Sequence, residues 1–350
     1  MKGTSQGRAM HRRSNSLEVL FWDWGGTLAD ERGQVCFGGR RALQALHGKL
    51  KLVVASNTED GEGIKAALAS AGSRGLVSQV TSATALGAAK PASAFYRGLL
   101  GHLGVRHRRA AMVGDDYVSD VAGAKGGGLR AYWYNPSAGP CPLGHPVHDG
   151  EVARLEDIPK LLQCRPLPDI ADCMRLLSRE EGAEPVMRHC LAVAGVAFCL
   201  AKELRARGLP LDPLLVHRGA LLHDLDKVAT VGTDHRHGAL ASLWLRRAGQ
   251  GTLAAIAEQH VASALVGRRS AELSWEAKVV HYADKLVEED RLVGLEARWE
   301  NLLYRYARYR PVLEEAYPAV VRIGEELQSI LGRSPEEVLS SMQPACTGHG

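Results

Sequence analysis

The hydrophobic pattern of this 350-residue chain changes character about halfway along. From residue 17 to residue 163, short β-rich runs alternate with runs of helical periodicity. Alternation of this kind predicts a doubly wound, Rossmann-like parallel sheet with helices on both faces. The predicted strands are residues 18–22, 51–56, 77–81, 110–113 and 129–134. The predicted helices between them are residues 40–46, 63–71, 91–103 and 118–125.

Beyond this region the sequence has helical periodicity throughout. Two prolines two residues apart (Pro166 and Pro168) stop helices and stiffen the chain, so residues 164–169 form the predicted linker. We expect helices at residues 170–178, 185–207, 213–222, 238–248, 252–260, 274–292, 294–308 and 311–331, with no competing strand. The predicted organisation is an α/β domain (17–163) and an all-helical domain (170–342), with flexible tails at 1–16 and 343–350.

Polar residues fall at the carboxyl ends of the predicted strands, where parallel sheets bind their ligands. Carboxylates, a lysine and a hydroxyl group on one rim would suit Mg²⁺ and a phosphoryl group. The alternative is turn chemistry, because Asp, Asn, Ser and Gly also favour strand-to-helix turns and helix caps. These residues are Asp23 after the first strand, Ser56 and Asn57 at the second, Lys90 before a helix, and Asp115, Asp116 and Asp120 after the fourth.

With these motifs, residues 17–163 resemble the haloacid dehalogenase-like (HAD) superfamily, mostly Mg²⁺ phosphatases that form an aspartyl-phosphate. The resemblance implies that Asp23 is the nucleophile. It implies that Ser56, with Asn57, binds phosphate and that Lys90 neutralises its charge. The implied Mg²⁺ ligands are Asp23, Gly25 through its carbonyl, Asp115 and Asp116, with Asp120 in support.

Gly25 departs from the family pattern. HAD phosphatases place a second aspartate there, two residues after the nucleophile, as general acid and base. Glycine cannot move a proton, and general acid–base catalysis is worth roughly 10²–10⁴-fold. The stretches between Asp23, Ser56 and Lys90 are needed for helices and strands and leave no room for a cap domain. We therefore expect a capless domain of weak or regulatory activity.

Histidines and aspartates recur on the predicted helices of the second half. Apolar residues at helical spacing flank each of them, so each helix would point its polar residue at the core. Buried imidazoles and carboxylates need partners, and a shared metal ion supplies one to all of them. For any single residue, a hydrogen-bonded core histidine or a capping aspartate is the alternative. The set comprises His189, His223, Asp224, His237, His260 and Asp284.

This ordered set resembles the HD-domain metal-dependent phosphohydrolases, over residues 170–342. The resemblance implies that His189, His223, Asp224 and Asp284 hold one metal ion. His237 and His260 match the extra histidines of members that hold two ions bridged by the aspartate, here Asp224. Mixed His/Asp ligation admits Mn²⁺, Fe or Zn²⁺.

Three neighbouring residues qualify this interpretation. Lys227, one helical turn after His223, is a candidate phosphate contact, although a helix C-terminus also favours lysine. Asp226 stands where many members carry glycine or another small residue; it would leave the ligands untouched and add negative charge near the site. His235 is an alternative to His237, which the following Gly238 favours.

Charge and hydropathy narrow the choice of partners. A net charge of +4 without a dense basic run does not indicate nucleic acid, and no stretch approaches the roughly 20 apolar residues of a membrane span. The apolar run at 17–24 is interrupted by Glu18 and Asp23, so it predicts a strand rather than a signal peptide, and the cytoplasm is the expected location. The aromatic and basic stretch 299–310 could bind a nucleotide or nucleic acid, or form a solvated face.

The resulting hypothesis is a metal-dependent phosphohydrolase. Its helical domain would cleave a small phosphorylated, nucleotide-like substrate, and its HAD-like domain would be weakly active or regulatory. One alternative is a bifunctional enzyme with both domains active. Another is a non-catalytic phosphate or nucleotide sensor.

Overall fold

The computed structural model describes residues 17–164, 166–233, 236–267 and 272–342. The predicted tails and His235 lie outside these ranges. The chain divides into two compact units. The α/β unit extends to Pro166, and the helical unit begins at Leu167 and also takes in the short segment Leu143–Pro146.

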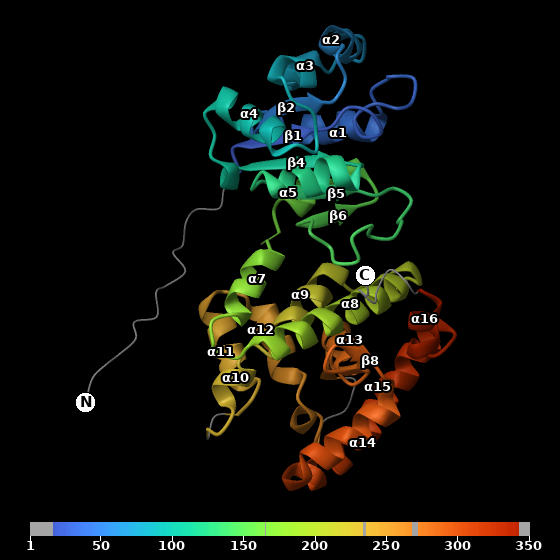
Figure 1. Ribbon diagram of the computed structural model, residues 1–350. Coiled ribbons are helices and arrows are strands. Elements are labelled where there is room, and N and C mark those ends of the chain that lie inside the picture. The colour runs from blue at the N-terminus through green and yellow to red at the C-terminus, as the bar shows by residue number, and fades with distance from the viewer. Residues whose placement is uncertain (1–16, 165, 234–235, 268–271, 343–350) are drawn as a thin grey trace, which may run out of the picture. The chain divides into compact units, whose positions relative to one another are not determined.

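Parallel strands form the single sheet that the structure describes in the α/β unit, in the order β3-β2-β1-β4-β5-β6 (Figure 1). β1 pairs with both β2 and β4, with Val19 opposite Lys51 and Ala110. The strand order reverses at β1, so the carboxyl ends of β1, β2 and β4 meet at a topological switch point. The strands are β1 (Val19–Trp22), β2 (Lys51–Ser56), β3 (Gln79–Ser82), β4 (Ala110–Gly114), β5 (Arg130–Tyr134) and β6 (Gly150–Val152).

Helices cover this sheet, which explains why its central strands are continuous apolar runs. All four residues of β1 are buried, as are all five of β4. The predicted helix at residues 118–125 begins instead as a π-helix, Tyr117–Ala122, a geometry that is frequent at functional sites. The α-helices are α1 (Phe37–Leu46), α2 (Gly61–Ser70), α3 (Ala83–Leu86), α4 (Ser93–Leu103), α5 (Gly123–Gly126) and α6 (Ile158–Leu161).

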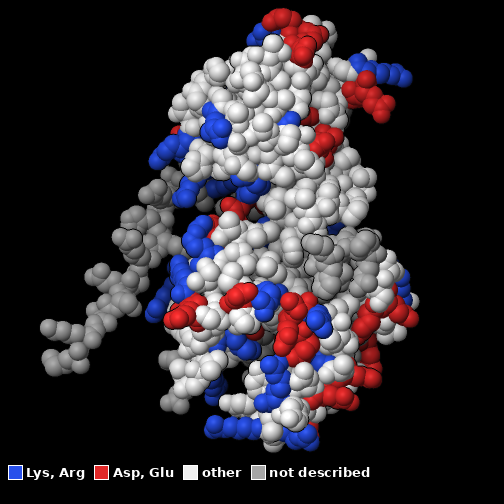
Figure 2. Space-filling view, viewed as in Figure 1, with Lys and Arg blue, Asp and Glu red and all other residues white. Residues whose placement is uncertain are grey.

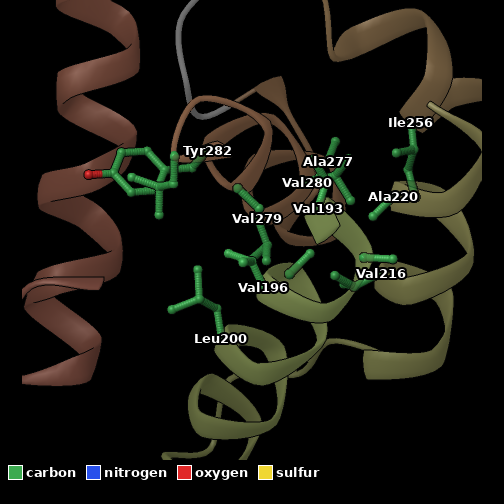
Figure 3. Close-up of a cluster of buried hydrophobic side chains, with 14 of the residues drawn as sticks. Val193, Val196, Leu200, Val216, Ala220, Ile256, Ala277, Val279, Val280 and Tyr282 are labelled. Carbon is green, nitrogen blue, oxygen red and sulfur yellow. The ribbon is translucent and has the colours of Figure 1, made fainter. Parts of the chain in front are cut away.

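The helical unit is built around one long helix, α8. Its apolar side chains meet those of α9, α12 and α13 in the core, where Val196, Val216, Ile256 and Val280 are buried (Figure 3). The helices of this unit are α7 (Ile170–Leu177), α8 (Glu184–Ala206), α9 (Pro213–Leu222), α10 (Lys227–Thr230), α11 (Ala239–Arg247), α12 (Gly251–Gln259), α13 (Trp275–Asp284), α14 (Leu295–Arg305), α15 (Arg310–Leu331) and α16 (Pro335–Ser341).

The predicted helix at residues 274–292 is wrong in its second half. α13 ends at Asp284, and the chain then forms a short antiparallel hairpin of β7 (Val287–Glu288) and β8 (Arg291–Leu292). The turn requires Glu289 at a φ of 54°, a left-handed conformation that helical periodicity does not reveal. The hairpin matters because the Glu289 carbonyl contacts a site histidine.

Helix α8 also corrects the hydropathy analysis. By length and composition alone it could cross a membrane, with a mean hydropathy of 1.3 in its most apolar window. However, 61% of that window is buried inside the protein, as in a core helix. α8 therefore has a packing role that accounts for its apolar composition.

Candidate metal centres in the two units

Asp23, Lys90 and Asp120 form a buried charge cluster at the carboxyl end of the parallel sheet. Asp23 directly follows β1, and Asp120 lies in the π-helix after β4. The Lys90 ammonium donates hydrogen bonds to both carboxylates, at 2.6 Å in the case of Asp120. The side chain of Asn57 fixes the Lys90 backbone, because its amide donates to the Lys90 carbonyl (3.0 Å) and its oxygen accepts from the Lys90 N–H (2.7 Å).

Asp115 completes a group of three carboxylates with Asp23 and Asp120, whose ligand atoms lie within 4.8 Å of one another. Thr27 orients Asp115, since its hydroxyl donates to Asp115 Oδ1 at 2.7 Å. Gly26 has a φ of 76°, and a Cβ there would lie 2.3 Å from the Asp115 carboxylate. The turn after β1 therefore needs glycine next to the carboxylate group.

Other predicted residues of this rim have local partners. Asp116 is exposed, and its side chain accepts a hydrogen bond from the Ser119 N–H (2.7 Å) as the cap of the π-helix. Ser56 is buried and its hydroxyl accepts from the Thr58 N–H (3.2 Å). The cluster of three carboxylates thus contains Asp120 in the place where the sequence analysis expected Asp116. The roles of Asp116 as a metal ligand and of Ser56 as a phosphate-binding residue stay predictions.

The negative charge of the carboxylates at this rim is only partly compensated by positive charge. Burial raises the pKa of Asp23, and burial together with the Asp23 charge raises the pKa of Asp120 to about 7. One lysine therefore does not neutralise three clustered carboxylates. Oxygen ligands alone make a donor set that suits Mg²⁺, so the residues present fit the ion that the family resemblance implies.

In the helical unit, three buried histidines are each held by a contact between Nδ1 and a backbone carbonyl. The Nδ1 of His189 lies 2.8 Å from the Glu289 carbonyl, that of His223 lies 2.6 Å from the Ala220 carbonyl, and that of His260 lies 2.7 Å from the Ala257 carbonyl. A carbonyl can only accept, so each Nδ1 carries the proton. The lone pair of each Nε2 is then available to a metal ion.

The Nε2 atoms converge on Asp224 and Asp284. His189 Nε2 lies 3.0 Å from Asp284 Oδ1, and His223 Nε2 lies 3.6 Å from the same oxygen. On the other side, His260 Nε2 lies 3.2 Å and His237 Nε2 2.7 Å from Asp224 Oδ1. The six predicted residues, drawn from separate helices and loops, are therefore in contact with one another.

Two metal-compatible groups can be recognised, and Asp224 belongs to both. One consists of His189, His223 and Asp224, and the other of Asp224, His237 and His260. A carboxylate shared by two groups is the arrangement expected of a bridging ligand. Asp284 also contacts the first group, since it lies beside both of its histidines.

Protons and a metal ion would compete for the histidine nitrogens of this cluster. His223 Nε2 is buried and has no hydrogen-bond partner among the described residues. Although burial lowers it, the pKa of His223 is raised well above its usual value by Asp224. Burial lowers the pKa of His260 to about 4, which keeps that ligand neutral. Metal binding at such a site displaces protons, so the residues present fit one or two divalent ions.

The structure gives Asp226 a role that the sequence analysis missed. Asp226 is fully buried and accepts hydrogen bonds from the Gly238 and Ala241 N–H groups, both at 2.9 Å, at the start of α11. Its carboxylate also lies 2.7 Å from His237 Nδ1. Rather than only adding charge, it positions a candidate ligand. The sequence feature that could have indicated this role is the position of Asp226 two residues after Asp224. That spacing alone does not reveal the role, because the role depends on where α11 packs.

We expect Asp226→Ala to lower the free energy of unfolding of the helical unit by about 2–4 kcal/mol, because it leaves the buried N–H groups of Gly238 and Ala241 without their acceptor and removes the carboxylate beside His237 Nδ1. Thermal and urea unfolding of the metal-free chain would measure this. Asp226→Asn keeps one acceptor oxygen and should lose less. Equal stability of Asp226→Ala and the unmodified chain would contradict the assigned role.

Two lysines border the histidine–aspartate cluster. Lys285 forms an ion pair with Asp284, and Lys227 Nζ lies 3.4 Å from Asp224 Oδ2. Although burial raises it, the pKa of Asp284 is held well below its usual value by Lys285 first and then by the histidines. Lys285 was not predicted, although it directly follows a predicted ligand. Both carboxylates are therefore ionised at neutral pH, since the pKa of Asp224, although burial raises it, is also held well below its usual value, by Lys227 first among its neighbours.

Two stretches of the chain match known families, one in each unit. Residues 25–128 match the haloacid dehalogenase-like hydrolases, and residues 186–288 match the HD domain. Both are metal-dependent hydrolase families, so the two matches support a hydrolase. The two matches support a fusion of a HAD-like domain with an HD domain, which confirms the resemblance and the fold class predicted from the sequence.

Similar proteins cover parts of the chain. It is 27% identical over 186 residues to a tRNA (cytidine(56)-2'-O)-methyltransferase of Picrophilus torridus, covering 50% of this chain and 51% of that protein. It is 28% identical over 160 residues to an uncharacterized protein of Methanocaldococcus jannaschii, covering 43% of this chain and 91% of that protein. The chain thus spans about half the length of the first relative. Among solved structures, a HAD phosphatase of Thermococcus onnurineus is 26% identical with a TM-score of 0.34, covering 38% of this chain and 60% of that one.

Proposed function

We propose that the helical unit is a metal-dependent phosphohydrolase that cleaves a phosphoric ester of a small, nucleotide-like substrate. The observation that carries this proposal is the pair of metal-compatible groups that share Asp224. His189, His223, Asp224 and Asp284 would hold one divalent ion, and His237 and His260 would help Asp224 hold a second. Such an ion, Mn²⁺, Fe or Zn²⁺ by its ligands, would lower the pKa of a water molecule and offset charge on phosphoryl oxygens.

The protein's own contribution is orientation. The backbone carbonyls fix the tautomers of the buried histidines, so the Nε2 lone pairs need no reorganisation when an ion binds. Lys227 stands beside Asp224 with its side chain 35% exposed, so it can reach a phosphoryl oxygen that arrives from solvent. Burial of the ligands keeps water away from the imidazoles and strengthens their electrostatic interactions.

We further propose that the α/β unit binds Mg²⁺ and phosphate with weak or regulatory turnover. Lys90 and the three carboxylates provide the charges for binding, whereas Gly25 provides no proton donor next to Asp23. A bifunctional enzyme is the second candidate. The observation that favours it is the buried Lys90–Asp23 contact, which places a cation beside the candidate nucleophile.

A screen of nucleotide phosphomonoesters and phosphodiesters with added Mn²⁺ tests the proposed function of the helical unit. The full-length chain should hydrolyse at least one substrate, and activity should depend on His223 and Asp224. Release of inorganic phosphate separates a phosphomonoesterase from a phosphodiesterase. If the chain hydrolyses none of the substrates while it holds its metal, the hydrolase proposal fails. The remaining hypothesis is then a non-catalytic phosphate or nucleotide sensor.

Metal binding should also increase the free energy of unfolding of the chain. At a free Mn²⁺ concentration of 100 times Kd, a ligand that binds only the folded state adds about 2.7 kcal/mol, which raises Tm. We expect this rise in a chain that carries Asp115→Asn to silence the α/β unit, and its loss when His223→Ala is added. His47→Ala, an exposed histidine, is the control. An equal rise with and without His223 would contradict the assigned ligand set.

A further inference from the structure

The connection between α14 and α15 exposes an unusual run of aromatic and basic side chains. Every residue from 304 to 310 is exposed, and we call this run the tyrosine–arginine segment. Tyr304 is 84% exposed, Tyr309 55% and Tyr306 41%. Rings of this size normally bury most of their surface, so three exposed tyrosines within six positions form an apolar area open to a partner.

Positive charge accompanies these rings. The Arg308 guanidinium lies 6.0 Å from the Tyr309 ring centroid, and among the described residues no carboxylate pairs with it. Arg305 and Arg310 lie 2.6 and 3.5 Å from Glu288 and Glu314, which offset part of their charge. Figure 2 shows Lys and Arg side chains gathered at the lower end of the helical unit, the end at which Figure 1 labels α14.

The segment borders the histidine–aspartate cluster of the same unit. Arg305 of the segment lies 2.6 Å from the Glu288 carboxylate in β7, and the carbonyl of the next residue, Glu289, lies 2.8 Å from His189 Nδ1. The segment therefore adjoins the hairpin that contacts a site histidine, and Tyr304 and Tyr309 are exposed beside it.

We propose that the tyrosine–arginine segment binds single-stranded nucleic acid, stacks its unpaired bases on Tyr304 and Tyr309, and presents the strand end to the site at Asp224. The inference rests on the proposed function for the reaction at that site, but the binding itself does not require hydrolysis. It narrows the substrate class from a nucleotide-like ester to the end of an oligonucleotide.

The surface chemistry favours a single strand over a duplex. Aromatic rings stack on any unpaired base, whereas paired bases offer no free face. A duplex would instead require a broad basic surface to neutralise its phosphates, and the net charge of the chain is only +4. Arg308 is the cation of the segment that pairs with no carboxylate in the described part of the chain, so the affinity should arise mainly from stacking and depend weakly on salt.

Fluorescence anisotropy with a labelled ten-nucleotide single strand, in EDTA, tests this inference. The full-length chain should bind the strand more tightly than the matching duplex. Tyr304→Ala with Tyr309→Ala should weaken binding at least about tenfold, since each stacked base is worth a measurable share of the affinity. Tyr304→Phe with Tyr309→Phe should restore it, because phenylalanine keeps the ring.

The α/β unit supplies a matched control. Phe37 is 73% exposed, and Arg41 lies 5.6 Å from its ring centroid, so the pair resembles Tyr309 and Arg308 but belongs to the other unit. Phe37→Ala should leave strand binding unchanged. Arg308→Gln should reduce the slope of log affinity against log salt by about 0.7, the value for one phosphate contact on a single strand.

Each outcome decides for or against the inference. It is overturned if the strand does not bind, if the duplex binds equally well, or if the double alanine variant binds like the unmodified chain. A surface for another protein would give the first of these results. Because the assay contains EDTA, strand binding can persist in His223→Ala even if no hydrolysis is ever found, which separates failure of this inference from failure of the proposed function.

Discussion

Replacing His223 or Asp224 by alanine is expected to reduce hydrolysis by the helical unit about 10³-fold or more. Asp224 belongs to both metal-compatible groups, so its loss removes a ligand from each. A bound ion supplies several kcal/mol of stabilisation to the charge that develops on a phosphoryl group, and each 1.36 kcal/mol is a factor of ten in rate. The measurement is the initial rate with Mn²⁺ on the best substrate of the nucleotide screen.

Two substitutions serve as matched controls for this experiment. Asp290→Ala removes an exposed aspartate of the helical unit, and His47→Ala removes an exposed histidine of the α/β unit. Both should keep full activity. Metal analysis of each purified variant should show loss of metal only in the His223 and Asp224 variants. Retention of hydrolysis in Asp224→Ala would place the reaction elsewhere and remove the basis of the proposed function.

The elements with strong local signals could be predicted from the sequence. The predicted strand 51–56 and helix 213–222 coincide with β2 and α9, because each is a mainly apolar stretch with a polar or proline residue at its boundary. The hairpin after α13 could not be predicted, because the left-handed Glu289 depends on tertiary contacts, including that of its carbonyl with His189. Local periodicity therefore predicted the presence of helices and strands better than it predicted the residues at which they end.

The site shows the same limit. Residue type and order sufficed to select the histidines and aspartates that meet in the helical unit. The sequence could not show that backbone carbonyls set the tautomers of these histidines, because those carbonyls depend on how the chain folds around them. Nor could it separate Asp116 from Asp120 after β4. A π-helix places Asp120 against Lys90 and leaves Asp116 as an exposed cap.

Gly25→Asp is expected to raise phosphatase activity of the α/β unit by about 10²–10⁴-fold, the range of general acid–base catalysis. The position can accept the side chain, since a Cβ on Gly25 would meet nothing within 4 Å and its φ is not in the left-handed region. The new carboxylate would stand two residues after Asp23 and could protonate a leaving oxygen. The assay uses the full-length chain with His223→Ala, Mg²⁺ and a generic phosphomonoester, so that the helical unit does not contribute.

The controls for Gly25→Asp separate proton transfer from added bulk. Gly25→Asn has nearly the same shape without a titratable carboxyl group, so it should stay at the level of the unmodified chain. Adding Asp23→Asn to Gly25→Asp should abolish the gain, because the nucleophile is then lost while Lys90 remains. If the unmodified α/β unit already turns over rapidly in an Asp23-dependent way, Gly25 is not limiting and the bifunctional enzyme is the better description. If Gly25→Asp binds Mg²⁺ but gains nothing, the weak turnover has another cause, and the open rim around Asp23 would be a binding site in its own right.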